Sequence, residues 1–235
     1  MKSTKSIAGE KLKTSVKDEF DKVANDYDKN RRKVIPFFDE FYLTGIDFLD
    51  PDIESLNVLD IGAGTGLFSE KLISRYPDAK LTLIDFSEEM LELAKCRFSE
   101  RLNVLYILDD YLSFKFEQSY DVIISALSIH HLNEGEKKDF YKKVFSLLNV
   151  GGEFINADQV ISQYPSVQEK YEKKWIDFVK NNGFSEEQIV GHRTRMSLDD
   201  PSTISDQIKW MSEAGFEIAE CLFKANNFAV LYGKK

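Results

Sequence analysis

The chain has 235 residues, enough for one well-packed domain and a subdomain, and its hydrophobic content of 43% is ordinary for a globular protein. Its 40 acidic residues outnumber its 31 basic residues, and the formal net charge of −9 disfavours a nucleic acid as partner. No apolar run reaches the roughly 20 residues that span a bilayer, so no membrane partner is expected. Cys96 and Cys221 lack a metal-ligand spacing, and the lysine-rich start lacks the apolar stretch of a secretory signal. We therefore expect a cytoplasmic protein.

The first predicted segment is helical, runs from Val16 to Leu49 and is broken near Pro36, because proline cannot continue a helix. An amphipathic stripe recurs in it at i, i+3, i+4 and i+7, through Phe20, Val23, Ala24 and Tyr27. By pattern alone, Tyr27 fits a core-facing aromatic as well as a ligand-facing one.

An apolar strand over residues 58–61 then runs into a loop with three glycines, Gly62, Gly64 and Gly66. Glycine allows a tight turn with positive φ and lets backbone N–H groups approach a polar ligand. A helix over residues 67–76 and a strand over residues 81–85 follow, and the strand ends in Asp85. This order is typical of the nucleotide-binding half of a doubly wound sheet, in which the acid binds two ribose hydroxyls.

The glycine spacing G-x-G-x-G differs from the G-x-G-x-x-G of dinucleotide-binding loops. Asp60 also precedes the loop, where its charge would repel a pyrophosphate. The loop therefore disfavours an oxidoreductase that binds a nicotinamide dinucleotide.

Three more strands are predicted before residue 160, over residues 104–108, 120–126 and 153–157. The first ends in Asp109, Asp110 and Tyr111, and the last ends at Asp158. Because ligands of open α/β sheets bind at the carboxyl ends of the strands, we expect these acids to line the same crevice. Helices are expected over residues 87–97, with Ser87 as N-cap, and over residues 135–148.

His130 and His131 follow the strand that ends at Ala126. Adjacent side chains diverge in direction and no third ligand is spaced for them, so we expect no metal site here. With Asp158, they are the nearest titratable candidates for a general base.

Residues 159–205 interrupt the alternation of strands and helices with a helical stripe and then a polar loop at residues 191–195. We expect a helical lid over the crevice. A helix over residues 204–214 follows, with Gly215 as its C-cap, and residues 216–223 and 227–232 pair as a closing hairpin.

The pattern as a whole predicts an α/β fold with a Rossmann-like, doubly wound, mostly parallel sheet of seven strands. We expect four units: a helical cap over residues 1–50, a cofactor-binding core over residues 51–158, the helical lid over residues 159–205, and a closing helix and hairpin over residues 206–235.

The glycine loop, with Asp60 before it and Asp85 after the next strand, resembles motif I of the class I S-adenosylmethionine-dependent methyltransferases. The resemblance implies an enzyme that transfers a methyl group from S-adenosylmethionine to a small-molecule acceptor. It implies cofactor contacts at Asp60, Gly62, Ala63, Gly64, Gly66, Asp85, Phe86, Asp110, Tyr111 and Ala126, with Asp109 as the alternative to Asp110.

The run Phe20-Asp21-x-x-Ala24-x-x-Tyr27-Asp28 is similar to the N-terminal helix that caps the cofactor in many small-molecule methyltransferases. There a tyrosine often faces the methyl donor and a nearby arginine binds the cofactor carboxylate, which implies that role for Arg32 or its neighbour Arg31. The run Ile129-His130-His131-Leu132 matches the family's common strand-end pattern, which implies a structural role for the histidines with one imidazole near the substrate. His130, His131 and Tyr27 are thus catalytic candidates without assigned roles.

The C-terminal part, with Phe178, Asn182-Gly183-Phe184-Ser185 and Ala214-Gly215-Phe216, is similar to carboxy-S-adenosylmethionine synthase. That enzyme modifies the cofactor itself, for the tRNA wobble-uridine modification pathway. The resemblance implies that Arg193 binds the cofactor carboxylate, and an arginine shared between subunits would require a homodimer. Phe38 and Ala126 depart from that enzyme's tyrosine and asparagine, and a solvated lid charge is the alternative for Arg193. The departures favour ordinary methyl transfer over cofactor modification, and a non-catalytic cofactor-binding module is the third alternative.

Overall fold

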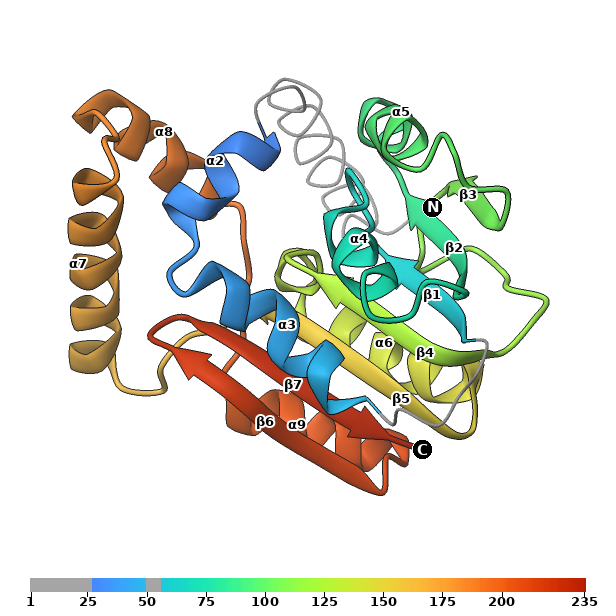
Figure 1. Ribbon diagram of the computed structural model, residues 1–235. Helices are drawn as coiled ribbons and strands as arrows, with labels where there is room; N and C mark the ends of the chain where they lie inside the picture. Colours follow the sequence, from blue (N-terminus) through green and yellow to red (C-terminus); the bar gives the residue numbers. More distant parts are fainter. Residues whose placement is uncertain (1–26, 50–55) are drawn as a thin grey trace, which may run out of the picture.

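The computed structural model of the protein describes residues 27–49 and 56–235, and within these ranges seven strands form one sheet (Figure 1). Their order is β3-β2-β1-β4-β5-β7-β6. The strands are β1 (Asn57–Ile61), β2 (Lys80–Asp85), β3 (Val104–Leu108), β4 (Tyr120–Ala126), β5 (Leu148–Gln159), β6 (Ile218–Ala225) and β7 (Phe228–Lys234). Strands β1 to β5 pair in parallel, and β7 pairs antiparallel with β5 and β6. The predicted seven-stranded, mostly parallel sheet is confirmed.

Helices cover both faces of the sheet (Figure 1). One face carries α3 (Phe38–Phe48), α4 (Leu67–Ile73) and α5 (Glu88–Arg97), and the other carries α6 (Glu134–Leu147) and α9 (Ile204–Ala214). Because successive side chains of a strand point to opposite faces, a strand between two helical layers must be apolar on both sides. In β1, Val58 joins the first core and Leu59 the second, and both are fully buried.

The strand order reverses between β1 and β4. β2 and β3 extend the sheet on one side of β1, and β5 extends it on the far side of β4. A crevice opens at the carboxyl ends of the strands at such a point, and it is the usual ligand site of this fold. The topology thus places the ends of β1, β2 and β4 around one crevice.

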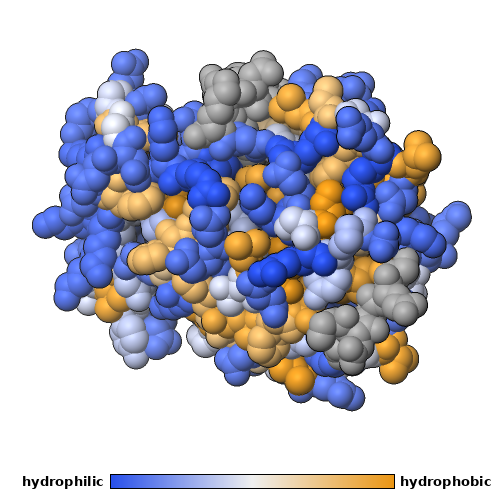
Figure 2. All heavy atoms as spheres, viewed as in Figure 1, coloured by the Kyte–Doolittle hydropathy of each residue, from blue (hydrophilic) through white to orange (hydrophobic). Residues whose placement is uncertain are grey.

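Three helices lie beyond the carboxyl ends of the strands: α2 (Tyr27–Val34), α7 (Pro165–Asn181) and α8 (Glu186–Met196) (Figure 1). The indole Nε1 of Trp175 in α7 donates a hydrogen bond of 2.9 Å to the carbonyl oxygen of Val34, which joins α7 to α2. Figure 2 shows hydrophilic residues over most of α7, whose buried residues are Trp175 and Val179. None of the described helices combines the length and apolar character that a membrane span requires.

The expectation of a polar loop at residues 191–195 is wrong, because this segment lies inside α8. Ser185 and Gln188 form a capping box that starts the helix, and Ile189 anchors it in the core with 3% exposure. At the C-terminus, the predicted helix over residues 204–214 is confirmed, and Gly215 ends it with φ 114°.

Asp60 in β1 is a charged residue inside the sheet, with 1% exposure. Its Oδ2 accepts a hydrogen bond of 2.7 Å from Ser69 Oγ in α4. Burial raises the pKa of Asp60 to about 7; the Ser69 hydrogen bond opposes this shift, and the nearby charge of Asp85 adds to it. Asp60 therefore lies behind the glycine loop and ties β1 to α4.

The raised pKa of Asp60 has a consequence for stability. The folded chain binds more protons at this residue than the unfolded chain between about pH 4 and pH 7, so Asp60 lowers stability as the pH rises through that window. We expect Asp60→Asn to remove this dependence, so that the free energy of unfolding of the variant rises relative to wild type by about 3 kcal/mol between pH 4.5 and pH 7.5.

Urea unfolding at both pH values measures this difference. Asp139→Asn, at a carboxylate with a side-chain exposure of 79%, is the control and should follow wild type at both. A difference in the free energy of unfolding between Asp60→Asn and wild type that is the same at both pH values would contradict the prediction.

Candidate active site

The glycine loop follows β1 at the point where the crevice opens. Gly62 has φ 65°, and a Cβ atom there would lie 2.1 Å from Ser128 Oγ, so the loop requires glycine for both conformation and space. Gly64 has φ 54° and open space where a side chain would be. The loop therefore packs against the end of β4 through Gly62 and presents bare backbone at Gly64. Gly66 begins α4 and packs on Phe98, outside the pocket lining.

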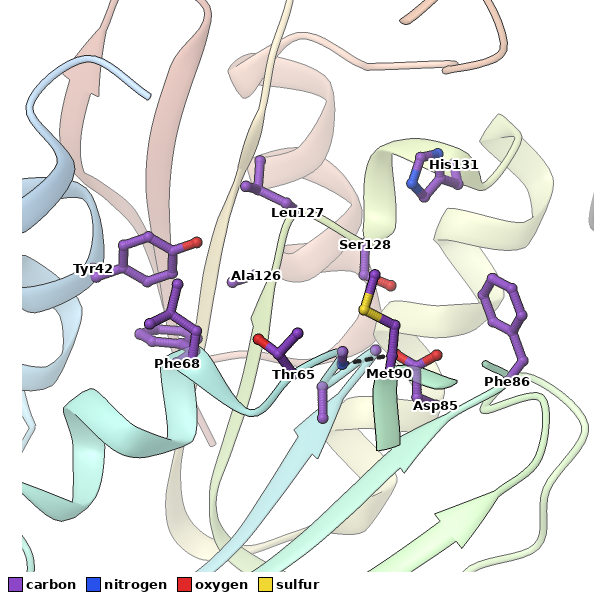
Figure 3. A pocket seen from close by; sticks show the side chains of 14 residues that line it. Tyr42, Thr65, Phe68, Asp85, Phe86, Met90, Ala126, Leu127, Ser128 and His131 are labelled. Atoms are coloured by element: carbon purple, nitrogen blue, oxygen red, sulfur yellow. Dashed lines mark hydrogen bonds between the residues drawn. The ribbon is translucent and has the colours of Figure 1, made fainter. Parts of the chain in front are cut away.

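Asp85 ends β2 and holds the loop in place (Figure 3). Its Oδ2 accepts a hydrogen bond of 2.8 Å from the backbone N–H of Gly64, and its Oδ1 accepts one of 2.9 Å from that of Ser87, the N-cap of α5. The side chain is buried, with 7% exposure. The carboxylate thus connects the loop, β2 and α5 at one point of the pocket.

The pocket at this point contains seven of the predicted site residues: Gly62, Ala63, Gly64, Asp85, Phe86, Ala126 and His131. Figure 3 shows Tyr42 and Phe68 at one end of the pocket and Phe86 at the other. Further lining residues were not predicted from the sequence, namely Tyr42, Thr65, Leu67, Phe68, Met90, Leu127 and Ser128. Thr65, Leu67 and Leu127 adjoin a predicted position along the chain, whereas Tyr42 comes from α3, and no local pattern distinguished it from a core aromatic.

Leu127 has a strained backbone at the end of β4. Its φ is 53°, a left-handed conformation that is uncommon for residues other than glycine. The turn starts the short helix η2 (Ile129–His131) and brings Ser128 against Gly62. The left-handed conformation of Leu127 thus allows the chain that follows β4 to pack against the glycine loop.

Asp110 and Tyr111 lie next to this pocket without lining it. Tyr111 is buried, and its hydroxyl accepts a hydrogen bond of 3.3 Å from Ser128 Oγ. The Oδ1 of Asp110 accepts one of 3.0 Å from the backbone N–H of Leu112. Their predicted contacts with adenine stay a prediction.

The structure makes Arg31 half-buried and leaves Arg32 exposed. Arg32 pairs with Asp39 at 2.7 Å on the surface, where its side chain is 57% exposed. Burial lowers the pKa of Arg31 to about 10, while the nearby Tyr42 acts in the opposite direction. Arg31 thus interacts electrostatically with Tyr42, which lines the pocket. The side chain of Tyr27 lies outside the described residues.

The two histidines lie side by side, which corrects the expectation that they diverge. Their ring centroids are 4.1 Å apart. His130 Nδ1 lies 2.5 Å from Asp158 Oδ1, and His131 Nδ1 lies 2.9 Å from Asp199 Oδ1. Asp199, which follows α8 and completes the group, was not predicted from the sequence.

The charges of this group act differently on the two rings. Burial alone would lower the pKa of His130, but the carboxylates of Asp158 and Asp199 outweigh it and raise the pKa. Burial and the charge of His130 lower the pKa of His131, against the opposing effect of Asp199. Two neighbouring imidazoles are thus driven toward different protonation states.

A second cavity of about 330 Å³ lies beside α7 and α8, in the part of the chain predicted to form the lid. Arg193, Met196 and Asp199 line it from the end of α8 and beyond, and Trp175 lines it from α7. Asn227 lines it from the turn between β6 and β7, and its buried Oδ1 has no hydrogen-bond partner among the described residues. Arg193 therefore lines this cavity and not the pocket at the glycine loop.

Residues 58–152 match the family model described as a methyltransferase domain. The chain is 26% identical to a carboxy-S-adenosyl-L-methionine synthase of Nautilia profundicola, over 92% of this chain and 94% of that one. It is 39% identical to a malonyl-[acyl-carrier protein] O-methyltransferase of Acetivibrio thermocellus, but over 39% of this chain and 32% of that one.

Solved structures share the fold. A putative O-methyltransferase from Nostoc punctiforme superposes with a TM-score of 0.65 at 17% identity, covering 92% of this chain and 60% of that one. The DhpI–SAH complex superposes with a TM-score of 0.64 at 16% identity, covering 94% of this chain and 96% of that one. With the glycine loop and Asp85 in place, residues 58–152 are therefore an S-adenosylmethionine-dependent methyltransferase domain.

Proposed function

We propose that this methyltransferase binds S-adenosylmethionine at the glycine loop and transfers the methyl group to a small-molecule acceptor in the cavity under the lid. The observation that carries the proposal is that the two spaces share a wall. His131 lines the pocket at the glycine loop, Asp199 lines the cavity, and the two side chains are 2.9 Å apart. A methyl donor on one side and an acceptor on the other would therefore be neighbours, and transfer requires the His131–Asp199 pair to move aside so that the acceptor atom reaches the methyl carbon in line with the breaking sulfur–carbon bond.

On the donor side, the proposed contacts follow from the chemistry of the lining. The Asp85 carboxylate suits the two ribose hydroxyls, because it is an acceptor of hydrogen bonds in a buried place. The backbone of Gly62, Ala63 and Gly64 faces the pocket without side chains in the way. Phe86 and Met90 supply apolar surface near Asp85, which suits adenine.

Methyl transfer from a sulfonium is an in-line displacement in which the cofactor supplies the reactive group. The chain must align the donor and the acceptor and exclude water, so proximity is the main contribution. An amine or hydroxyl acceptor also loses a proton. Tyr27, His130 and His131 remain the catalytic candidates, and of these His131 lines the pocket.

On the acceptor side, the lid residues fit a compact organic molecule. Trp175 and Met196 offer apolar surface, Arg193 offers a positive charge, and Asn227 Oδ1 offers a buried hydrogen-bond acceptor. A cavity lined in this way suits a small molecule better than a polymer.

We extend the proposal to three further properties of the protein. Residues 159–205 form a lid over the cavity, and the protein is a homodimer if the lid is shared between subunits. Its location is cytoplasmic.

The second candidate function is modification of the cofactor itself. It is favoured by the likeness to carboxy-S-adenosyl-L-methionine synthases, which extends over 92% of this chain. In that case Arg193 would bind a carboxylate carried by the cofactor. Arg193 lines the second cavity and not the pocket at the glycine loop, so this role requires the carboxylate to reach into the second cavity.

Asp85→Ala tests the donor site. We expect a loss of affinity for S-adenosylhomocysteine of at least 100-fold, because the variant loses both the ribose contact and the hydrogen bond that positions Gly64. Isothermal titration calorimetry measures it. Asp78→Ala, at an exposed residue before the opposite end of β2, is the matched control and should bind as wild type does. Equal affinity in both variants would refute the assignment of this pocket.

Arg193→Gln separates the two candidate functions. We expect plain S-adenosylmethionine or S-adenosylhomocysteine to co-purify with the wild-type chain, and the variant to bind S-adenosylhomocysteine within twofold of wild type. Mass spectrometry of the released ligand and calorimetry give the two readouts. Arg195→Gln, at the neighbouring lid arginine, is the control. Recovery of a carboxylated cofactor from wild type, and its loss from Arg193→Gln alone, would favour cofactor modification.

A further inference from the structure

Two histidines and two aspartates meet in the wall between the two cavities. We call His130, His131, Asp158 and Asp199 the His–Asp cluster. They come from three places in the chain: η2 after β4, the end of β5, and the segment after α8. The methyl transfer proposed above needs at most one general base from this group, and its other members have no role in that reaction.

Three of the four side chains present ligand atoms to a common point. One atom each from His130, His131 and Asp199 lies within 4.8 Å of the other two. Asp199 spans both rings: Oδ2 lies 3.6 Å from His130 Nε2, and Oδ1 lies 2.9 Å from His131 Nδ1. Ligands bound to one ion at about 2.0–2.2 Å lie roughly 3–3.5 Å from one another. The spacing therefore suits a shared cation with small side-chain adjustments.

Asp158 supplies the outer contact that metal-binding histidines usually have. Its Oδ1 lies 2.5 Å from His130 Nδ1, and its Oδ2 accepts a hydrogen bond of 3.0 Å from the His130 backbone N–H. A carboxylate on the far nitrogen fixes the orientation of an imidazole and directs the other nitrogen to the ion. His130 is thus held with Nε2 toward Asp199.

The charge of the cluster also favours a cation. Asp158 and Asp199 place two carboxylates in the interior, with side-chain exposures of 3% and 7%. A metal ion binds imidazoles in their neutral form, and with any proton on His130 released, the cluster carries two negative charges, which burial makes costly. A divalent ion would neutralise both. Nitrogen ligands from two imidazoles with one carboxylate suit a first-row transition metal better than Mg²⁺ or Ca²⁺.

We propose that His130, His131 and Asp199 bind one divalent transition-metal ion, with Asp158 as the outer partner of His130. Three protein ligands leave further coordination positions open. His131 lines the pocket at the glycine loop and Asp199 lines the cavity under the lid, so such an ion would lie between them. In that place it would orient an oxygen or nitrogen of the acceptor; this part of the inference rests on the proposed function.

The test uses the full-length chain without an affinity tag, stripped with a chelator and titrated with Co²⁺. We expect one equivalent to bind with micromolar or tighter affinity and to give visible d–d absorption. His131→Gln and Asp199→Asn should each weaken binding at least 10-fold. Asp200→Asn, at the neighbouring acid outside the ligand set, is the matched control and should bind as wild type does.

Three outcomes would overturn the proposal. They are no saturable Co²⁺ binding by the wild-type chain, wild-type affinity for Co²⁺ in both ligand variants, or a loss of affinity in the Asp200→Asn control as large as in the ligand variants. X-ray absorption of the cobalt-loaded wild-type chain needs no variant, so it decides the matter even if the variants unfold. Two imidazoles around the ion support the proposal, and fewer contradict it. Asp85→Ala should keep Co²⁺ binding, which separates this inference from the proposed function.

Discussion

The hydrogen bond between the Gly64 backbone N–H and the Asp85 carboxylate is the contact on which the rest of the site depends. It joins the glycine loop to the end of β2, and the other carboxylate oxygen joins the start of α5 through Ser87. Hydrogen bonds to a charged acceptor are strengthened where water is excluded, and Asp85 is buried. One side chain therefore fixes three elements, and the same carboxylate faces the space where a ribose would bind.

The His–Asp cluster is the second feature that organises the site, because its residues come both from the matched methyltransferase domain and from the chain that follows it. His130 and His131 follow β4, inside the matched methyltransferase domain, whereas Asp199 comes from the segment after α8. Asp199 also lines the cavity under the lid. The segment after α8 is thus connected to the core at the place where donor and acceptor would meet. Displacement of this segment would change the environment of both imidazoles at once.

Most of the fold could be predicted from the sequence, because buried parallel strands are apolar runs and their ends are marked by glycine and acids. The helix caps Ser87 and Gly215 could also be predicted, because capping depends on the residue type at the helix end and not on distant contacts. The site could be predicted only in part. Arg31 and Arg32 are neighbours whose side chains leave the helix in different directions, and pattern could not decide which one is buried. The pairing of Asp199 with His131 is a tertiary contact with no local pattern. Residues 191–195 were misassigned on polarity, although the capping box of Ser185 and Gln188 was present in the sequence.

This division between local and tertiary features explains why the donor is easier to identify than the acceptor. The donor pocket is made largely of residues inside the matched domain, such as Gly62, Asp85 and His131. The acceptor cavity is made of residues after it, including Trp175, Arg193 and Asn227. Enzymes that share a cofactor but differ in acceptor need the same geometry in the cofactor pocket and different geometry in the acceptor cavity. Accordingly, the chain is 39% identical to the Acetivibrio thermocellus relative over 92 residues, whereas it is 26% identical to the Nautilia profundicola relative over 92% of its length. Under the proposed function, the choice of acceptor would therefore reside in the chain that follows β5, where a substitution could alter the substrate without disturbing Asp85 or the glycine loop.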